Sequence, residues 1–236
     1  MNKPAAYLST CLLLAALSGS AVAQPESWPD WRHGHSGHAQ ALSAAERSDE
    51  PLVVYFQTDW CPWCRKLNDR YLRNGAVREM LARMQKVELN PERGHSERAL
   101  FGRYGGSGFP SFYVLVPGSG ERPVKLSPFR RSGEQSLDEF AGAIQTAVTT
   151  HYDRWAHRLE RGGDDTRALQ VLERSLSFNP HNAYAHYLQG LIHHKIGHER
   201  RDVERLRKAK AAYERALALD PGHAASRRGL DVLRNL

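Results

Sequence analysis

Two cysteines separated by two residues, Cys61 and Cys64, stand in the stretch TDWCPWCRKL. A pair at this spacing can be a redox-active dithiol, half of a zinc site or a structural disulfide. Zinc normally takes four ligands, and the sequence contains no second CxxC motif. The chain is also long enough to fold without a disulfide staple. A redox-active pair is therefore the favoured interpretation, and the other two stay open.

The neighbouring residues predict that the pair lies between a strand and a helix. Residues 51–56 (PLVVYF) form an apolar run with β-branched residues, which is typical of a buried strand. A helical pattern begins around the second cysteine, so Cys61 would start the helix in an exposed position, with the less accessible Cys64 one turn further in. Because a helix N-terminus lowers the pKa of a thiol, Cys61 is predicted to be the attacking thiolate and Cys64 the resolving thiol.

Apolar strands alternate with helical patterns up to about residue 148, which predicts an α/β domain over residues 38–148. Ser136 and Glu139 form a capping-box pattern at the start of its last helix. The Pro-, Gly- and His-rich residues 24–37 are predicted to be an irregular N-terminal arm. The other predicted strands cover residues 85–90, 111–116 and 122–127, and the other predicted helices cover residues 38–47, 76–84 and 96–104.

These features resemble the thioredoxin superfamily. The resemblance rests on the buried strand, on Trp60 directly before Cys61, on the CPWC pair and on the Gly-Phe-Pro sequence that ends at Pro110. It implies a cis peptide bond before Pro110, and it implies that Pro110, Phe109 and Trp60 position an extended substrate chain. It also implies thiol–disulfide exchange through Cys61 and Cys64, with no bound cofactor.

One position departs from that family. Thioredoxins usually carry a buried acid six residues before the first cysteine, where this chain has Tyr55. Asp59 is the candidate replacement for proton transfer. The Pro-Trp dipeptide between the cysteines is similar to that of glutaredoxins, although this chain lacks their compact organisation. The stretch TDWCPWCRKL as a whole is most similar to exported thioredoxin-like proteins related to the reducing end domain of DsbD-type proteins. That similarity favours reduction of substrate disulfides.

From residue 149 onward the sequence shows no strand pattern, and residues 149–236 are predicted to be helical throughout. Two units, 149–182 and 183–223, place small, large and proline residues at corresponding positions. The corresponding pairs are Ala168 and Ala209, Leu172 and Tyr213, Ser175 and Ala216, and Pro180 and Pro221. They resemble the tetratricopeptide repeat (TPR), a helix pair of about 34 residues that stacks into arrays with concave surfaces.

The second unit is longer than the first, and the extra residues are placed in the stretch HERRDVERLR, either between its two helices or as an extension of the second helix. Gly190 corresponds to Ala156 as the small residue where two helices cross closely, whereas Gly163 and Gly197 predict turns between helices. A last amphipathic helix at about residues 223–235 would cap the two repeats.

Residues 1–23 predict a signal peptide that is cleaved after Ala23. Lys3 supplies the positive charge, an apolar run follows, and Ala21-Val22-Ala23 fits the small-x-small cleavage pattern. Cys11 would leave with this peptide. No second apolar run of about 20 residues follows, so no transmembrane segment is expected after cleavage. The mature protein is expected in the periplasm, where disulfides persist.

Neither the positive net charge nor the N-terminal histidines adds a favoured function. The net charge is +7, but no nucleic-acid-binding motif accompanies it, so no nucleic-acid partner is expected. His33, His35 and His38 could hold a metal ion, although their segment offers no carboxylate or sulfur ligand. A solvated N-terminal arm without metal is favoured.

Together these observations predict a periplasmic thiol–disulfide oxidoreductase that acts on protein disulfides through Cys61 and Cys64. Its expected partners are substrate proteins, a redox partner protein, and a protein or peptide bound by the TPR-like tail. The alternative is an adaptor or assembly protein of the TPR type, in which the thioredoxin-like domain is not catalytically essential. Metal delivery through the pair and the histidines is a third, weaker hypothesis.

Overall fold

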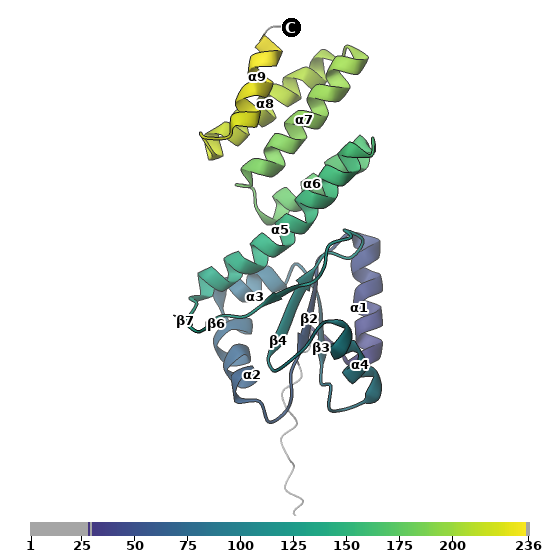
Figure 1. Cartoon of the computed structure of the whole chain (residues 1–236), viewed down its shortest axis with the longest axis vertical. Coiled ribbons are helices and arrows are strands. Elements are labelled where there is room, and N and C mark those ends of the chain that lie inside the picture. Colours follow the sequence, from purple (N-terminus) through teal and green to yellow (C-terminus); the bar gives the residue numbers. More distant parts are fainter. Residues whose placement is uncertain (1–27, 29, 235–236) are drawn as a thin grey trace, which may run out of the picture.

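The computed structural model describes residue 28 and residues 30–234, so the predicted signal peptide lies outside the described residues. An α/β domain is followed by stacked helices (Figure 1). The strands are β1 (Arg32–His33), β2 (Leu52–Phe56), β3 (Gln85–Leu89), β4 (Ser111–Leu115), β5 (Val124–Leu126), β6 (Phe129–Arg130) and β7 (Gly133–Glu134). The helices are α1 (Gly34–Ser48), α2 (Pro62–Leu67), η1 (a π-helix, Asn68–Leu72), α3 (Gly75–Leu81), α4 (His95–Arg103), α5 (Leu137–Arg161), α6 (Asp165–Phe178), α7 (Ala183–Arg200), α8 (Val203–Leu219) and α9 (Ala224–Arg234).

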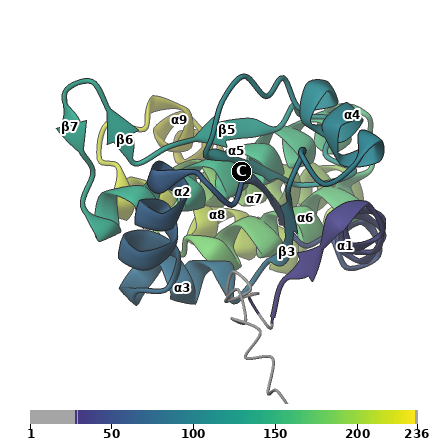
Figure 2. The same ribbon diagram turned by 90° about the horizontal axis from the view of Figure 1, so that it is seen from below.

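Five strands form one sheet in the order β1-β3-β2-β4-β5. β3 runs parallel to both β1 and β2, whereas β4 is antiparallel to β2 and to β5. Helices α1 and α4 cover one face of the sheet, and α2, α3 and α5 cover the other (Figures 1 and 2). Every residue of β2 is buried because both faces of this central strand are covered, which explains its continuous apolar sequence.

The prediction of an irregular arm over residues 24–37 is wrong from Arg32 onward. Arg32–His33 pairs with β3, and α1 begins at Gly34. Gly and His are weak helix formers, so the sequence pattern did not reveal this start. Tertiary contacts stabilise it, since Ala41 and Ala45 pack into the core and Nε2 of His38 lies 3.0 Å from the Tyr104 hydroxyl.

The predicted capping box at the start of α5 is confirmed, with Ser136 and Glu139 bonding reciprocally. The helix then continues to Arg161, across the predicted domain boundary at residues 148 and 149. Phe140 packs on the sheet in the first part of α5, and Tyr152 contacts Phe178 of α6 in the second part. A single hydrophobic core therefore joins the α/β domain to the first helices of the tail.

The tail consists of antiparallel helices, and α9 confirms the predicted last helix. A side-chain carbon at Gly190 would lie 2.6 Å from the Tyr213 ring, which confirms the predicted close crossing. Gly163 confirms a turn between α5 and α6, at a φ of +83°. The predicted turn at Gly197 is wrong, because Gly197 lies inside α7 and packs closely against Leu206. The stretch 198–207 forms the end of α7, a two-residue turn and the start of α8, which confirms the predicted extension of the second helix and shows that the first helix is lengthened as well.

The tail and the cysteine pair lie at different ends of the α/β domain. Figure 1 shows the stacked helices above the sheet, whereas the loop from β2 to α2 lies at its lower edge. The tail helices therefore leave open the surface of the α/β domain at which the cysteine pair lies (Figure 1).

Within the described part of the chain, no helix combines the length and the apolarity that crossing a membrane requires.

Candidate active site

Cys61 and Cys64 form a disulfide with Cα atoms 5.2 Å apart. Cys61 is the N-cap of α2, and its Sγ accepts a hydrogen bond from the backbone N–H of Cys64 at 3.0 Å. Pro62 occupies the first turn, where its missing N–H costs nothing. The predicted placement of the pair at a helix N-terminus is confirmed. This position favours a negative charge on the Cys61 sulfur once the disulfide is reduced.

The prediction that Cys61 is exposed is wrong for this oxidised state. Cys61 is 2% exposed and Cys64 is 1% exposed. The exposed side chains beside the disulfide are instead those of two tryptophans, one on each side of Cys61 in the sequence. Trp60 is 62% exposed and Trp63 is 49% exposed. These two indoles are thus the large exposed hydrophobic side chains next to the disulfide.

The Phe109–Pro110 peptide bond is cis, which confirms the expectation from the resemblance. The Phe109 ring stacks on Phe101 at a centroid distance of 5.0 Å and meets the Trp60 ring edge-on at 6.3 Å. The structure thus brings together Trp60 and Phe109, which are far apart in the sequence. They form an aromatic contact between the loop before α2 and the loop before β4.

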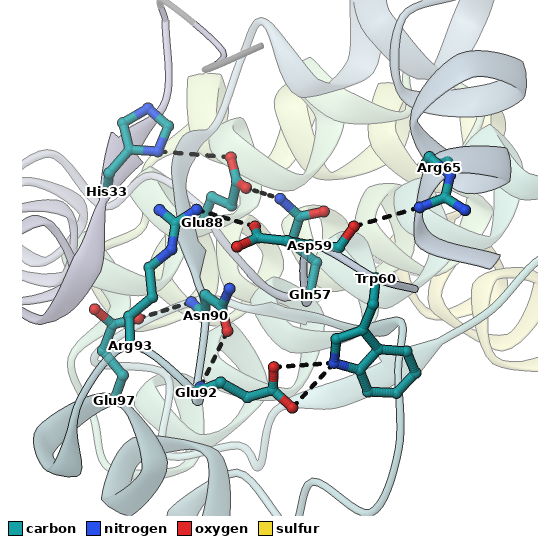
Figure 3. A network of polar contacts seen from close by, with 10 residues as sticks. All are labelled: His33, Gln57, Asp59, Trp60, Arg65, Glu88, Asn90, Glu92, Arg93 and Glu97. Carbon is teal, nitrogen blue, oxygen red and sulfur yellow. Dashed lines mark hydrogen bonds and ion pairs between the residues drawn. The ribbon is translucent and has the colours of Figure 1, made fainter. Parts of the chain in front are cut away.

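Asp59, the candidate for proton transfer, lies on the surface. Its carboxylate forms an ion pair with Arg93 at 2.9 Å, and its backbone carbonyl accepts a hydrogen bond from Arg65 (Figure 3). The Asp59 side chain is 54% exposed. This geometry ties the β2–α2 loop to the loop after β3 and leaves the Asp59 carboxylate in contact with solvent.

Tyr55, at the position where thioredoxins usually carry a buried acid, is fully buried in β2. Its hydroxyl donates to the backbone carbonyl of Cys64 at 3.5 Å. Burial, with a smaller contribution from the charge of Glu88, raises the pKa of the Tyr55 hydroxyl far above its ordinary value. Tyr55 therefore stays neutral and acts as a hydrogen-bond donor to the helix that carries the resolving cysteine.

Residues 34–117 match the model of a thioredoxin-like family. The N-terminal α/β domain is thioredoxin-like. Known structures similar to this chain include a DsbH oxidoreductase, at 20% identity and a TM-score of 0.41, covering 55% of this chain and 94% of that one. A thioredoxin from Thermus thermophilus has 24% identity and a TM-score of 0.40, with coverages of 50% and 86%. The oxidised C-terminal domain of DsbD from Neisseria meningitidis has 20% identity and a TM-score of 0.39, with coverages of 48% and 93%. No curated protein matches this chain.

Sequence reasoning missed the β6–β7 hairpin, which lies beside α2 in the thioredoxin-like domain. Phe129 contacts Trp63 at a centroid distance of 5.0 Å and Tyr71 at 5.8 Å. Lys66 and Arg70, both in the α2–η1 segment, form ion pairs with Glu134 of the hairpin. The two-residue strands carry too short a pattern to be recognised, although Phe129 signals a packed segment.

Sequence reasoning also missed Glu88. It lies in β3 in register with Tyr55, and its neighbours on the strand are apolar. A charged residue inside a predicted buried strand is the signal that could have drawn attention to it, because an ionised carboxylate is costly to bury without partners.

The N-terminal histidines take part in packing and polar contacts. His33 lies 3.5 Å from Glu88, and burial is the main cause that lowers the pKa of His38. Among the residues that the structure describes, no group of three His, Cys, Asp or Glu side chains is arranged to hold a metal ion.

Proposed function

We propose that this protein is a thiol–disulfide oxidoreductase that reduces disulfides of exported proteins. The observation that carries the proposal is the Cys61–Cys64 pair at the N-terminus of α2 in a thioredoxin-like domain. A helix N-terminus stabilises the thiolate that exchange requires. The second cysteine, one turn away, is within bonding reach, as the disulfide demonstrates.

The proposed reaction begins with the reduced pair. The Cys61 thiolate attacks one sulfur of the substrate disulfide, which forms a mixed disulfide and releases the other substrate sulfur as a thiolate that takes up a proton. Cys64 then loses its proton and attacks Cys61, which restores the Cys61–Cys64 bond and releases the second substrate thiol. The substrate gains two electrons and two protons. The pair supplies both electrons, Cys64 gives up one proton, and solvent supplies the other, which it received when the Cys61 thiol ionised. A redox partner protein with a dithiol returns the electrons.

Substrate positioning is assigned to Trp60, Phe109 and Pro110. Trp60 is exposed, its ring contacts Phe109, and Phe109 precedes the cis proline. An aromatic surface at this place suits an extended polypeptide with apolar side chains next to its cysteine.

The helical tail is proposed to be TPR-like and to recruit a protein or peptide. Its stacked helix pairs, with the Gly190–Tyr213 crossing, support this proposal. Because the tail packs through α5 and α6 on the thioredoxin-like domain, a recruited partner would be held at a fixed distance from the β2–α2 loop. The alternative, an adaptor whose redox pair is not essential, rests on the same helices.

A trapping experiment tests the exchange reaction. A Cys64→Ser variant lacks the resolving thiol, so Cys61 should stay bound to substrate proteins in mixed disulfides that dithiothreitol releases. A Cys61→Ser variant should trap none. The adaptor alternative instead predicts that Cys61→Ser leaves the cellular phenotype intact.

Export is tested separately. The proposed periplasmic location predicts that the mature protein begins at Gln24 and is released with the periplasmic fraction. A full-length N-terminus in the cytoplasmic fraction would contradict it.

A further inference from the structure

Glu88 is a carboxylate held inside the sheet, on the same face as the active-site helix. Registered residues of parallel strands project to the same side, and Glu88 pairs with Tyr55. Tyr55 belongs to the core cluster that includes Leu67 of α2, whereas Val87 and Leu89 belong to the cluster on the other face. The Glu88 side chain is only 14% exposed. The carboxylate therefore lies on the face of the sheet that α2 covers, next to Tyr55.

Polar and charged groups from each neighbouring element surround this carboxylate (Figure 3). The Gln57 amide donates a hydrogen bond to Oε1, and Nδ1 of His33 lies 3.5 Å from Oε2. Burial raises the pKa of Glu88 above its usual range. The Gln57 hydrogen bond and the charges of His33 and Arg93 act in the opposite direction, and Asp59 adds to the rise. Glu88 can therefore take up a proton closer to neutral pH than an exposed glutamate does.

Tyr55, the register partner of Glu88, contacts the backbone of Cys64, and Thr58, which follows Gln57 in the chain, contacts the backbone of Cys61. Tyr55 donates to the Cys64 carbonyl at 3.5 Å. Gln57 directly precedes Thr58, whose carbonyl accepts the N–H of Cys61 at 3.2 Å. The Thr58 hydroxyl is buried and has no hydrogen-bond partner among the described residues. Glu88 is thus linked to the segment that carries the pair by its register with Tyr55 and by its hydrogen bond from Gln57, which adjoins Thr58 in the chain.

We propose that Glu88 is the buried proton acceptor for the resolving thiol, taking from the neighbouring strand the role that Tyr55 cannot fill. The inference rests on the proposed exchange reaction. When Cys64 attacks the mixed disulfide, its thiol proton passes to the Glu88 carboxylate through intervening polar groups. The Cys64–Cys61 bond forms, the Cys61–substrate bond breaks, and the substrate leaves as a thiolate. That thiolate is then protonated, and Glu88 returns its proton to solvent.

A measurement on the unaltered protein tests whether Glu88 senses the pair. The Glu88 carboxyl is titrated by carbon-detected NMR in the oxidised and in the reduced protein. A Cys61 thiolate close to Glu88 should raise its pKa in the reduced form by about one unit, a tenfold change in proton affinity. Identical titrations in the two redox states would overturn the proposal.

A kinetic measurement tests the role itself. Glu88→Gln keeps the shape of the side chain and an oxygen that can accept from Gln57, but it cannot take up the proton. Resolution of a preformed mixed disulfide should slow by about 100-fold, while the first attack by Cys61 changes less than about twofold. The wild-type resolution rate should rise with pH through the pKa of Glu88, and the variant should lack that rise.

The matched control is Glu79→Gln, which removes a carboxylate from an exposed position on α3. It should leave both steps and the pH profile unchanged. If wild-type protein exchanges disulfides and Glu88→Gln resolves with wild-type rate and pH dependence, the Glu88 assignment is wrong and the proposed function stands. If wild-type protein does not exchange disulfides, the proposed function itself fails.

Discussion

The indole N–H of Trp60 donates to both carboxylate oxygens of Glu92, at distances of 2.9 and 3.1 Å (Figure 3). Trp60 is the most exposed of the large hydrophobic side chains beside the cysteine pair, yet this bond and the edge contact with Phe109 fix its orientation. An exposed indole held in one orientation loses little freedom when it binds a partner. Glu92 thus orients the Trp60 ring, to which we assign a role in substrate positioning.

Replacing Glu92 with alanine should free the Trp60 ring. We expect the KM for a protein disulfide substrate to rise by about threefold to tenfold with little change in kcat, because uniform binding is lost. A small aromatic disulfide, which does not span the Trp60–Phe109 surface, serves as the control substrate and should react at the wild-type rate. Unchanged KM values for protein substrates would contradict the positioning role of Trp60.

Replacing Phe129 with alanine should loosen the β6–β7 hairpin. The ring contacts Trp63 and Tyr71, so its loss should lower the free energy of unfolding by about 1–3 kcal/mol in urea denaturation. Arg131→Ala is the matched control in the same hairpin. Its side chain is exposed, and we expect a change within about 0.5 kcal/mol. Equal effects of the two substitutions would argue against packing of the hairpin on α2.

Two helix glycines should respond in opposite directions to replacement by alanine. At Gly190 the new methyl group would lie 2.6 Å from the Tyr213 ring, so Gly190→Ala should destabilise the protein by about 1–3 kcal/mol. At Gly142 in α5 no atom lies within 4 Å, and Gly142→Ala should stabilise by up to about 1 kcal/mol. Thermal denaturation of both variants measures their stability relative to wild type. A Gly190→Ala variant that is more stable than wild type would refute the close crossing.

Asp153 should make the stability of the protein depend on pH. Burial is the main cause that raises its pKa, and hydrogen bonds from Ser175 and Asn182 only partly oppose it. From about pH 4 up to the raised value, the folded state therefore binds more protons than the unfolded state. The extra proton bound by folded Asp153 stabilises the folded state, and this stabilisation is lost as the pH rises from about 4 to the raised pKa.

The variant Asp153→Asn removes the titration, so its stability relative to wild type should improve as the pH rises through the same window. Asp69→Asn, at a side chain that is 69% exposed, is the control and should run parallel to wild type. Urea denaturation at several pH values gives the comparison. Parallel curves for Asp153→Asn and wild type would show that the Asp153 carboxyl titrates normally.

The sequence was sufficient to predict the elements that have strong local patterns. β2 and β4 carry apolar runs, β3 alternates charged and apolar residues over its last four positions, and the capping box at Ser136 marks the start of α5. The cysteine pair at the N-terminus of α2 and the cis peptide at Pro110 follow from motifs near them in the chain. Local residue types decide the strands and the capping box, whereas the cis peptide at Pro110 was expected from the resemblance to the thioredoxin superfamily.

Features that depend on tertiary contacts could not be predicted in this way. The start of α1 at Gly34 depends on packing against the sheet, and the two-residue strands of the hairpin depend on Trp63 and Tyr71. The place of Glu88 depends on its register with Tyr55 across two strands. No local pattern encodes which residue of one strand lies beside which residue of another.

The most direct test of thiol–disulfide exchange is the turnover of insulin disulfides with dithiothreitol as the electron source. The account predicts that the wild-type protein accelerates insulin reduction well above the rate with dithiothreitol alone, and that Cys61→Ser abolishes the acceleration while remaining folded. Equal acceleration by wild-type and Cys61→Ser protein, or none by the wild type, would contradict the central claim that Cys61 is the attacking thiol of a redox-active pair.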